Sequence, residues 1–372
     1  MSASFGHTYK TTIFGESHGP GIGCIIQGAP AGFQVDKQEL GDFLARRRPN
    51  SRLWSTPRTE TDTPVFISGI CEDGIIEGTP ICALIKNKDP RSHAYDKLRD
   101  TPRPSHADYA ADVKWKGNQD IRGGGHFSGR LTASLCISGG IAKQILAKKG
   151  IRISAHILKI GPFEDTPFAA NKTDAATRKK LEEQMDSLDT SWLSVLDSKV
   201  ADNILDYMDE IHNQKDSCAG IIECVASGLR PGVGTPRFDG IDARLAQACL
   251  AIPGCKGFEM GEGFGFADLL GSTANDPYIQ EGNQILPLTN NSGGVTGGIS
   301  TGAPLWFKVA IKPTPSIQAP QQTLNIKTGN QEILQVPGRH DSCIVPRVVP
   351  VVESVCAATL LDILESEAFE NM

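Results

Sequence analysis

The sequence predicts an α/β fold built from two internally related halves. Apolar strand-like runs alternate with longer runs that are apolar at helical spacing, and glycine or proline marks most of the junctions. A turn leading to a helix, a strand ending at lysine, and a long apolar run after arginine each occur twice in the same order. The copies are offset by about 200, 224 and 217 residues. Chance is an alternative explanation, because strand–glycine–helix segments are common.

We expect one domain, residues 1–372, with a first half at about 1–160 and a second half at about 218–372. Between them, the segment 162–217 is polar, rich in charge and poor in glycine, with helical stretches expected at 173–185 and 199–211. This composition is typical of either an inserted helical flap or a linker between the halves.

In the first half, strands are expected within 12–28, on either side of a glycine-rich loop at 15–21. Asp36 and Glu39 have the spacing of a capping box, so a helix begins there and ends before Pro49. Strands follow at 65–70 and 80–85, and a helix at 131–149 with Gly150 as its stop.

The second half repeats this alternation. Strands are expected at 151–160 and 219–227, followed by a helix at 242–250. A strand then ends at Lys312, and an apolar helix at 348–364 closes the chain.

The bulk composition excludes several classes of protein. A net charge of -6 argues against a nucleic-acid coat protein. Ten cysteines without a Cys-x-x-Cys pair or a Cys/His quartet argue against a zinc site and against a disulfide framework. We therefore expect no metal, and we expect a reducing compartment. No signal peptide and no 18-residue apolar run is visible, so we expect a cytoplasmic protein that makes no contact with membrane.

The segment 122–132, Arg-Gly-Gly-Gly-His-Phe-Ser-Gly-Arg-Leu-Thr, runs directly into the start of a helix. Exposed amides and the helix dipole make such a segment a candidate anion site. It lacks the lysine of a Walker loop and the spacing of a Rossmann loop. An ordinary glycine turn before a core helix is the alternative.

Five arginines fall between residues 46 and 58 of this acidic chain. They form either a solvated face near a helix C-terminus or a pocket for phosphate and carboxylate groups. Two loop histidines, His18 and His106, are surface residues or functional groups. If His106 is functional, Asp108 is placed to orient its ring.

Six motifs resemble those of the chorismate synthase family, in family order over nearly the whole chain. They are Phe14-Gly-Glu-Ser-His-Gly19, Arg46-Arg-Arg-Pro49, Arg103-Pro-Ser-His-Ala-Asp108, the glycine stretch 123–132, Lys312-Pro-Thr, and Gly338-Arg-His-Asp341. Many members have Ser-Ser-Ala-Arg-Glu-Thr where this chain has Phe127-Ser-Gly-Arg-Leu-Thr132, so the contact made by residue 127 differs.

The resemblance implies a sandwich of antiparallel sheets around a helical core, assembled as a homotetramer. It also implies the last step of the shikimate pathway. Phosphate and a hydrogen leave 5-enolpyruvylshikimate 3-phosphate in an anti 1,4 sense to give chorismate. Reduced FMN is required without net redox change, and it is supplied either with NADPH as the reductant or by a separate flavin reductase.

The resemblance also assigns roles to residues. His18 is the candidate acid for phosphate departure, His106 keeps the reduced flavin suitably protonated, and Asp341 lies where proton removal ends. Substrate binding is assigned to Arg47, Arg52, Arg130 and Arg339, the first two of which are also linked to NADPH. The FMN-binding residues are His126, Phe127, Ser128, Pro253, Gly254, Gly297, Lys312, Pro313, Thr314, Pro315, Ser316 and Arg339.

Two rival functions follow from the same residues. A phosphatase or phosphoryl-transfer enzyme at the Gly123 loop needs a metal-binding Asp pair or a Walker lysine, and the sequence shows neither. An RNA-binding module using the arginines conflicts with the acidic balance and with an aromatic content of 6%.

Overall fold

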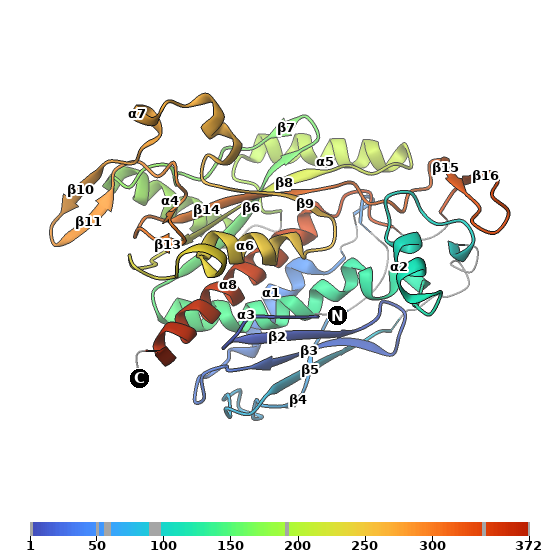
Figure 1. The fold of residues 1–372 in the computed structure, drawn as a ribbon, viewed down its shortest axis with the longest axis horizontal. Helices are drawn as coiled ribbons and strands as arrows, with labels where there is room; N and C mark the ends of the chain where they lie inside the picture. Colours follow the sequence, from blue (N-terminus) through green and yellow to red (C-terminus); the bar gives the residue numbers. More distant parts are fainter. Residues whose placement is uncertain are drawn as a thin grey trace.

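The computed structural model describes residues 3–49, 52–55, 61–88, 98–189, 193–336 and 340–370. Two five-stranded sheets, antiparallel throughout, lie on opposite sides of a layer of helices (Figure 1). The first sheet has the order β1-β2-β3-β5-β4, formed by Ser4–Phe5, Lys10–Gly15, Gly21–Gln27, Ile81–Lys86 and Val65–Ser68. The second has the order β7-β6-β8-β14-β9, formed by Phe163–Glu164, Arg152–Ile160, Gly220–Ser227, Leu305–Ile311 and Cys255–Met260.

Four helices lie between the two sheets (Figure 1). Two of them, α3 and α8, pack along each other, and two shorter helices flank them; the four are α1 (Lys37–Arg47), α3 (Thr132–Lys148), α6 (Ile241–Leu250) and α8 (Val345–Glu370). The predicted α/β class, with antiparallel sheets around a helical core, is therefore confirmed.

Smaller elements decorate this sandwich. They are α2 (Asp108–Trp115), α4 (Ala175–Asp189), α5 (Ser198–Asn213), α7 (Gly271–Ala274), and the hairpins β10–β11 (Tyr278–Glu281, Gln284–Pro287), β12–β13 (Val295–Thr296, Ile299–Ser300) and β15–β16 (Gln321–Leu324, Gln331–Leu334). Single 3-10 turns occur at 122–127, 129–131, 237–239 and 263–268. No helix among the described residues is both long and apolar enough to cross a bilayer.

The strand orders of the two sheets correspond. Strands β2-β3-β5-β4 of the first sheet match β6-β8-β14-β9 of the second. In both sheets a helix follows the second of these four strands in the chain: α1 follows β3, and α6 follows β8. The long helices α3 and α8 then follow β5 and β14. This correspondence supports the proposal of two related halves around one core.

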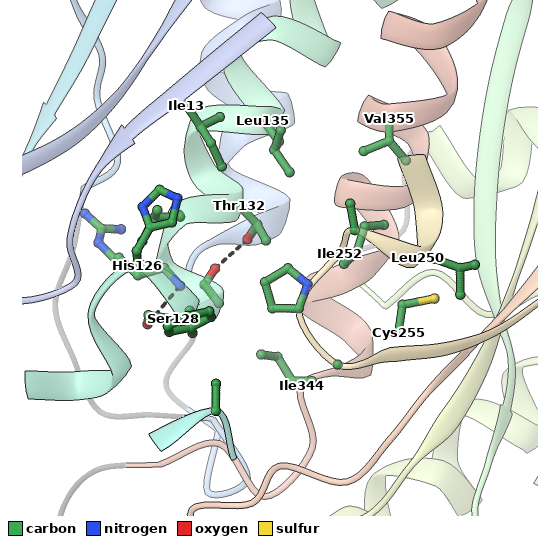
Figure 2. Close-up of a pocket in the computed structure, with 18 of the residues that line it drawn as sticks. Ile13, His126, Ser128, Thr132, Leu135, Leu250, Ile252, Cys255, Ile344 and Val355 are labelled. Carbon is green, nitrogen blue, oxygen red and sulfur yellow. Dashed lines mark hydrogen bonds between the residues drawn. The ribbon is translucent and has the colours of Figure 1, made fainter. Parts of the chain in front are cut away.

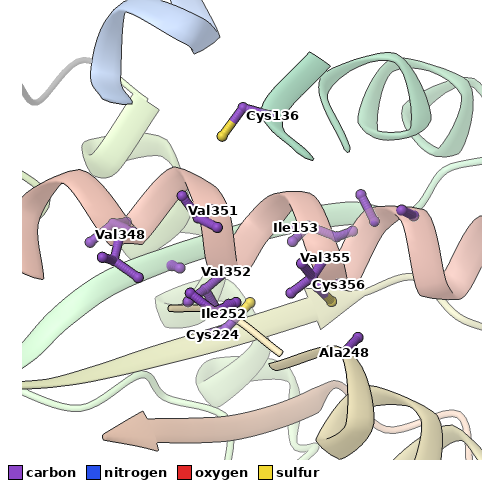
Figure 3. Packing of buried hydrophobic residues seen from close by; sticks show 14 of the residues in the cluster. Cys136, Ile153, Cys224, Ala248, Ile252, Val348, Val351, Val352, Val355 and Cys356 are labelled. Atoms are coloured by element: carbon purple, nitrogen blue, oxygen red, sulfur yellow. The ribbon is translucent and has the colours of Figure 1, made fainter. Parts of the chain in front are cut away.

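The core is built around α8, which is buried on all sides from Val345 to Ile363, apart from Pro346's partial exposure. A helix that is mostly apolar on every face belongs inside a protein, and here it lies against the second sheet (Figure 3). Gly139 of α3 allows the closest approach between the two long helices. A Cβ built there would lie 2.2 Å from the Cα of Ser354, so a larger residue would force the helices apart.

A buried carboxylate joins three of the central helices. Glu353 of α8 accepts hydrogen bonds from Arg46 of α1 at 2.7 and 3.0 Å and from Lys143 of α3 at 2.5 Å. Burial alone would raise the pKa of Glu353, but the two cations outweigh it and lower the pKa to about 2. Since both partners are charged, this cluster fixes the relative positions of the helices.

The segment 162–217 covers the outer face of the second sheet (Figure 1). Neighbouring strand residues alternate between faces: Cys224 packs into the central core, and Val225 packs with α4. Under this cover, His156 lies 3.0 Å from Asp165 and 3.0 Å from Glu223, with all three side chains buried. Burial would lower the pKa of His156, but the two carboxylates raise it, so both ring nitrogens serve as donors.

Candidate active site

A cavity of about 1050 Å³ opens between the N-terminal ends of α3 and α8, the turn after α6 and the end of β14 (Figure 2). Much of its wall between the helices is apolar, including Ile13, Leu135 and Val355. Most of the predicted site residues line it: His106, His126, Phe127, Ser128, Arg130, Pro253, Gly254, Lys312, Pro313, Thr314, Pro315, Ser316 and Asp341.

The cavity is basic although the chain is acidic. Among the described residues that line it are six cations and two carboxylates: Arg103, Arg130, Arg244, Lys256, Lys312 and Arg347, against Asp239 and Asp341. This local excess of positive charge inside a chain of net charge -6 suits anionic ligands.

The glycine loop forms the contact between the two predicted histidines. Gly123, Gly124 and Gly125 all have positive φ angles, of 59°, 86° and 52°, which other residues rarely adopt. A Cβ built on Gly123 would lie 2.2 Å from Cε1 of His18, and one on Gly124 would lie 3.2 Å from Nε2 of His106. The two histidines therefore contact neighbouring residues of the loop, His18 at Gly123 and His106 at Gly124. His18 is buried behind it, and His106 faces the cavity.

His106 is held by an arginine and a carboxylate from its own motif. Nδ1 of His106 lies 2.5 Å from Oδ1 of Asp108 and 3.1 Å from Nη2 of Arg103. Arg103 also donates to both oxygens of Asp108 at 2.7 Å. Burial would raise the pKa of Asp108, but hydrogen bonds from Arg103 and His106 hold it well below its usual range. An ionised Asp108 accepts a hydrogen bond from Nδ1 of His106, and the other ring nitrogen, Nε2, is turned toward Gly124.

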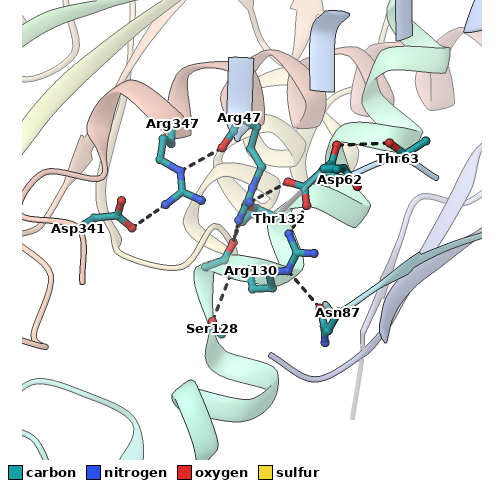
Figure 4. A network of polar contacts seen from close by, with 11 residues as sticks. Arg47, Asp62, Thr63, Asn87, Ser128, Arg130, Thr132, Asp341 and Arg347 are labelled. Carbon is teal, nitrogen blue, oxygen red and sulfur yellow. Dashed lines mark hydrogen bonds and ion pairs between the residues drawn. The ribbon is translucent and has the colours of Figure 1, made fainter. Parts of the chain in front are cut away.

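Two of the predicted substrate arginines belong to a buried network (Figure 4). Arg47, the last residue of α1, donates from Nε to Thr132 at 3.1 Å and from Nη2 to the carbonyl of Gly129 at 2.6 Å. Its Nη1 lies 3.3 Å from Asp62, whose other oxygen accepts from Nη1 of Arg130. The network places Arg47 directly behind the cavity wall that Arg130 and Thr132 form.

Asp341 is paired with an arginine of α8. Nη1 of Arg347 donates to Oδ2 of Asp341 at 2.6 Å, and Nε of Arg347 donates to the carbonyl of Arg47 at 3.0 Å. Thr314 donates to the backbone carbonyl of Asp341 at 2.8 Å. These contacts connect Asp341 to both the arginine network and the 312–316 segment.

The 312–316 segment crosses to the His106 loop. Nζ of Lys312 donates to the carbonyl of Ser105 at 2.5 Å, and Arg103 donates to Oγ of Ser316 at 2.9 Å. Burial, together with the nearby cation of Lys256, lowers the pKa of Lys312. The motif that follows β14 and the motif that precedes α2 therefore form one wall.

The remaining predicted residues fall in several places. Phe127 lines the cavity and packs on Trp115 with ring centroids 5.5 Å apart. Gly297 lies away from the cavity lining, in the β12–β13 turn beside the start of α6, whereas Pro253 and Gly254 follow the end of that helix. Arg52 is exposed and is not part of the lining. Arg339 lies outside the described residues, as does Arg58 of the arginine cluster.

Sequence reasoning did not single out three charged residues that the structure places here: Asp62, Arg103 and Arg347. Arg103 lies inside a recognised motif, three residues before His106, so its spacing was a usable signal. Arg347 lies in the first turn of α8, and Arg130 lies in the 3-10 turn just before α3, so the repeat could have indicated Arg347. Asp62 has no local signal, because its partners come from distant elements.

Comparison with known proteins gives a consistent result. A family model described as chorismate synthase matches residues 9–364. A curated chorismate synthase of Lancefieldella parvula is 46% identical over 369 residues, covering 98% of this chain and 97% of its own length. One from Thermococcus gammatolerans is 42% identical over 368 residues, covering 99% of each chain. A solved structure titled "Crystal Structure of Chorismate Synthase" has a TM-score of 0.75 at 26% identity, covering 99% of this chain and 98% of that one.

The fold and these relatives define an enzyme of the lyase class. The chain belongs to the chorismate synthase family, and the match covers nearly its whole length.

Proposed function

We propose that this chain converts 5-enolpyruvylshikimate 3-phosphate into chorismate and inorganic phosphate by an anti 1,4-elimination, the last step of the shikimate pathway. One observation supports this above the others. In a member of this family, a basic cavity gathers His106, the loop over His18, and Asp341 from three distant segments of an acidic chain. A substrate with one phosphate and two carboxylates needs such a concentration of positive charge.

The cavity also fits reduced FMN, the cofactor that we propose. When bound, reduced FMN supplies transient electron donation that is returned within the turnover. The lining offers an apolar wall at Ile252, Pro253 and Ile344 for a flat ring system, and Lys312 and Ser128 for polar groups. Its volume of about 1050 Å³ is at the upper end of ordinary ligand sites, which suits two ligands together.

In this proposal the chain's own residues divide the work. His18 donates a proton to the departing phosphate oxygen, which general acid catalysis typically accelerates by ~10²–10⁴-fold. His106, oriented by Asp108, keeps the reduced flavin suitably protonated through its Nε2 nitrogen. Asp341 acts as the final base when the substrate's hydrogen is removed as a proton. Arg47 and Arg130 bind the substrate, together with Arg52 and Arg339, and Arg47 and Arg52 serve NADPH if the enzyme reduces its own flavin.

We further propose a cytoplasmic homotetramer that receives reduced flavin either through NADPH or from a separate reductase. The ten cysteines, all unpaired and mostly buried, support a reducing compartment.

The decisive assay is anaerobic. Purified protein is mixed with substrate and chemically reduced FMN, and chorismate and phosphate are measured together. Equal amounts of both, and neither without reduced FMN, are the expected result. Phosphate released without a conjugated diene would instead indicate a phosphatase. A parallel reaction with NADPH and oxidised FMN, with and without added flavin reductase, determines the source of electrons.

A further inference from the structure

Asp62 occupies the centre of the arginine network, and none of the proposed roles uses it. Its side chain is fully buried, and its two oxygens face different arginines (Figure 4). Oδ2 lies 3.3 Å from Nη1 of Arg47, and Oδ1 accepts from Nη1 of Arg130. One carboxylate therefore bridges the two arginines that we assign to the substrate.

The charges around Asp62 explain why a carboxylate is needed there. Arg47, Arg130 and Arg347 are all more than nine-tenths buried, and Arg347 contacts the backbone of Arg47. Burial, followed by the charge of Arg347, lowers the pKa of Arg47 to about 10, against the attraction of Asp62. Because Asp341 pairs with Arg347, Asp62 is the carboxylate that the described network offers to Arg47 and Arg130. Without an anion between them, the two guanidinium groups would repel each other.

A phosphate monoester could satisfy the same two groups. Like a carboxylate, it presents oxygens to guanidinium N–H groups, and it carries more charge. We propose that Asp62 is an internal counter-ion that occupies the phosphate-binding position of Arg47 and Arg130, and that the phosphate of the incoming ligand displaces it. The inference rests on the proposed function, because that function makes these arginines a phosphate site.

The backbone at Asp62 is consistent with an exchangeable contact. Its φ of 47° lies in the left-handed region, which a non-glycine residue adopts at some cost. The two arginine contacts offset this cost when no ligand is bound. A ligand that takes over the two arginine contacts removes the stabilisation that offsets the left-handed backbone of Asp62.

A different role predicts the opposite effect of removing the charge. If Asp62 only holds the arginines in place behind a ligand, its loss disorders them and weakens phosphate binding. If it competes with the ligand, its loss strengthens phosphate binding. The sign of the change in affinity therefore separates the two roles.

The test uses inorganic phosphate as the probe, titrated into the full-length protein by calorimetry at constant ionic strength. Asp62→Asn is expected to lower the dissociation constant for phosphate about tenfold, and Asp62→Glu, which keeps the charge, is expected to leave it near the wild-type value. The matched control is Glu353→Gln, which removes another buried carboxylate paired with an arginine of α1, but one whose partners are Arg46 and Lys143 rather than Arg47 and Arg130. It should lose stability and keep the wild-type phosphate affinity.

Phosphate that binds Asp62→Asn no better than wild type, or binds neither protein, overturns the proposal. Should Asp62→Asn fail to fold in plain buffer, phosphate is expected to restore folding, because it replaces the missing counter-ion; failure of that rescue also overturns the proposal. Failure of the proposed function has a different signature, since wild-type protein would then form no chorismate whatever its affinity for phosphate.

Discussion

His106 acquires its orientation from two neighbours within five residues of the chain. Asp108 is the first residue of α2, so the start of that helix fixes the carboxylate, and Arg103 clamps it from the other side. A histidine that contacts an ionised carboxylate through Nδ1 presents Nε2 for chemistry. The motif at 103–108 is therefore held as one unit by the contacts of Asp108 with Arg103 and His106.

Replacing Asp108 with asparagine should therefore impair turnover more than binding. We expect kcat to fall ~10–100-fold, because an amide does not fix the ring tautomer as a carboxylate does. His106→Ala should lose at least as much while retaining flavin. Steady-state chorismate formation and a separate titration of flavin measure the two effects. Asp112→Asn, one turn further along α2 and more exposed, is the control and should be near wild type. Full activity in Asp108→Asn would remove orientation of His106 from the mechanism.

Asp341 lies where the arginine network meets the 312–316 segment, so it is suited to affect chemistry through position and charge. Asp341→Asn keeps the shape and removes the base. We expect both ligands to bind with affinities within about threefold of wild type while turnover falls ~10²–10⁴-fold, the usual range for loss of an acid or base. Rapid mixing under anaerobic conditions separates binding from product formation. Unchanged turnover would refute the proposed role in proton removal.

At the scale of elements, the glycine loop at 122–132 packs against the loop between β2 and β3 and leads into the start of α3. The amide of Ser17 donates to the carbonyl of Gly125 at 3.2 Å, and Nδ1 of His126 lies 3.2 Å from the carbonyl of Gly15. The two predicted glycine-rich segments thus contact each other, and a Cβ built on Gly123 would lie 2.2 Å from the ring of His18, so there is no room for a side chain at that point.

Gly123→Ala should consequently remove activity even though it adds one methyl group. The new Cβ would overlap the ring of His18, and the left-handed conformation adds a cost of ~1–2 kcal/mol. We expect a folded protein with a lower melting temperature and a loss of turnover of at least tenfold. Gly41→Ala in α1 is the matched control, since nothing lies within 4 Å of its added Cβ and alanine favours a helix. A fully active Gly123→Ala would mean that His18 needs no fixed position.

The junction of α8 with α1 and α3 predicts a dependence of stability on pH. The pKa of Glu353 is lowered in the folded protein, from 4.5 to about 2, so its ionised form contributes stability above pH 4.5. That contribution, about 3 kcal/mol at most, is lost as the pH falls from 4.5 toward 2. Denaturant titrations at intervals of pH should show the loss. Glu353→Gln should be less stable at pH 7 and lose less on acidification. Equal slopes for the two proteins would show that another group controls acid unfolding.

Local patterns were sufficient to predict the main elements. Asp36 caps α1 as expected, since its carboxylate accepts from the amides of Gln38 and Glu39, but its own amide donates to Gln144 rather than to Glu39 as a full capping box requires. The strands on either side of the 15–21 loop form as expected. The strand expected at 65–70 ends earlier, at Ser68, and the closing helix begins at Val345 rather than at 348. The short hairpins were not predicted, because strands of two to four residues carry too little periodicity.

At the scale of the whole molecule, the site depends on contacts that no local pattern records. The bridge made by Asp62 joins residues 15 and 68 positions away in the chain, and the contact of Arg347 with Arg47 spans 300. Recognition of the motifs supplied the candidate residues, but only the folded chain shows which of them share a cavity. Gly297 and Pro253, for example, were assigned to the same cofactor, and in the folded chain Pro253 lines the cavity while Gly297 lies at the other end of α6.

The surface carries one segment whose exposed side chains are hard to explain in a monomer. Phe264 and Leu270 are 82% and 74% exposed, and Phe266 and Leu269 beside them are each 37% exposed. Four large apolar side chains exposed within seven residues of the chain are a feature that subunit contacts often cover. This segment is therefore the place where we expect contacts of the proposed tetramer.

The double variant Phe264→Ser, Leu270→Ser should shift the protein from tetramers to smaller species without unfolding it, because both side chains are largely outside the core. Sedimentation velocity across a range of micromolar concentrations measures the shift, and circular dichroism checks the fold. Tyr109→Ser on α2, at a site 57% exposed but distant in sequence, is the control and should remain tetrameric. A variant that stays tetrameric would place the subunit contacts elsewhere, and a wild type that is monomeric throughout would refute the tetramer itself. If assembly is lost together with turnover, then subunit contacts also support the cavity; if turnover survives, each chain forms its site alone.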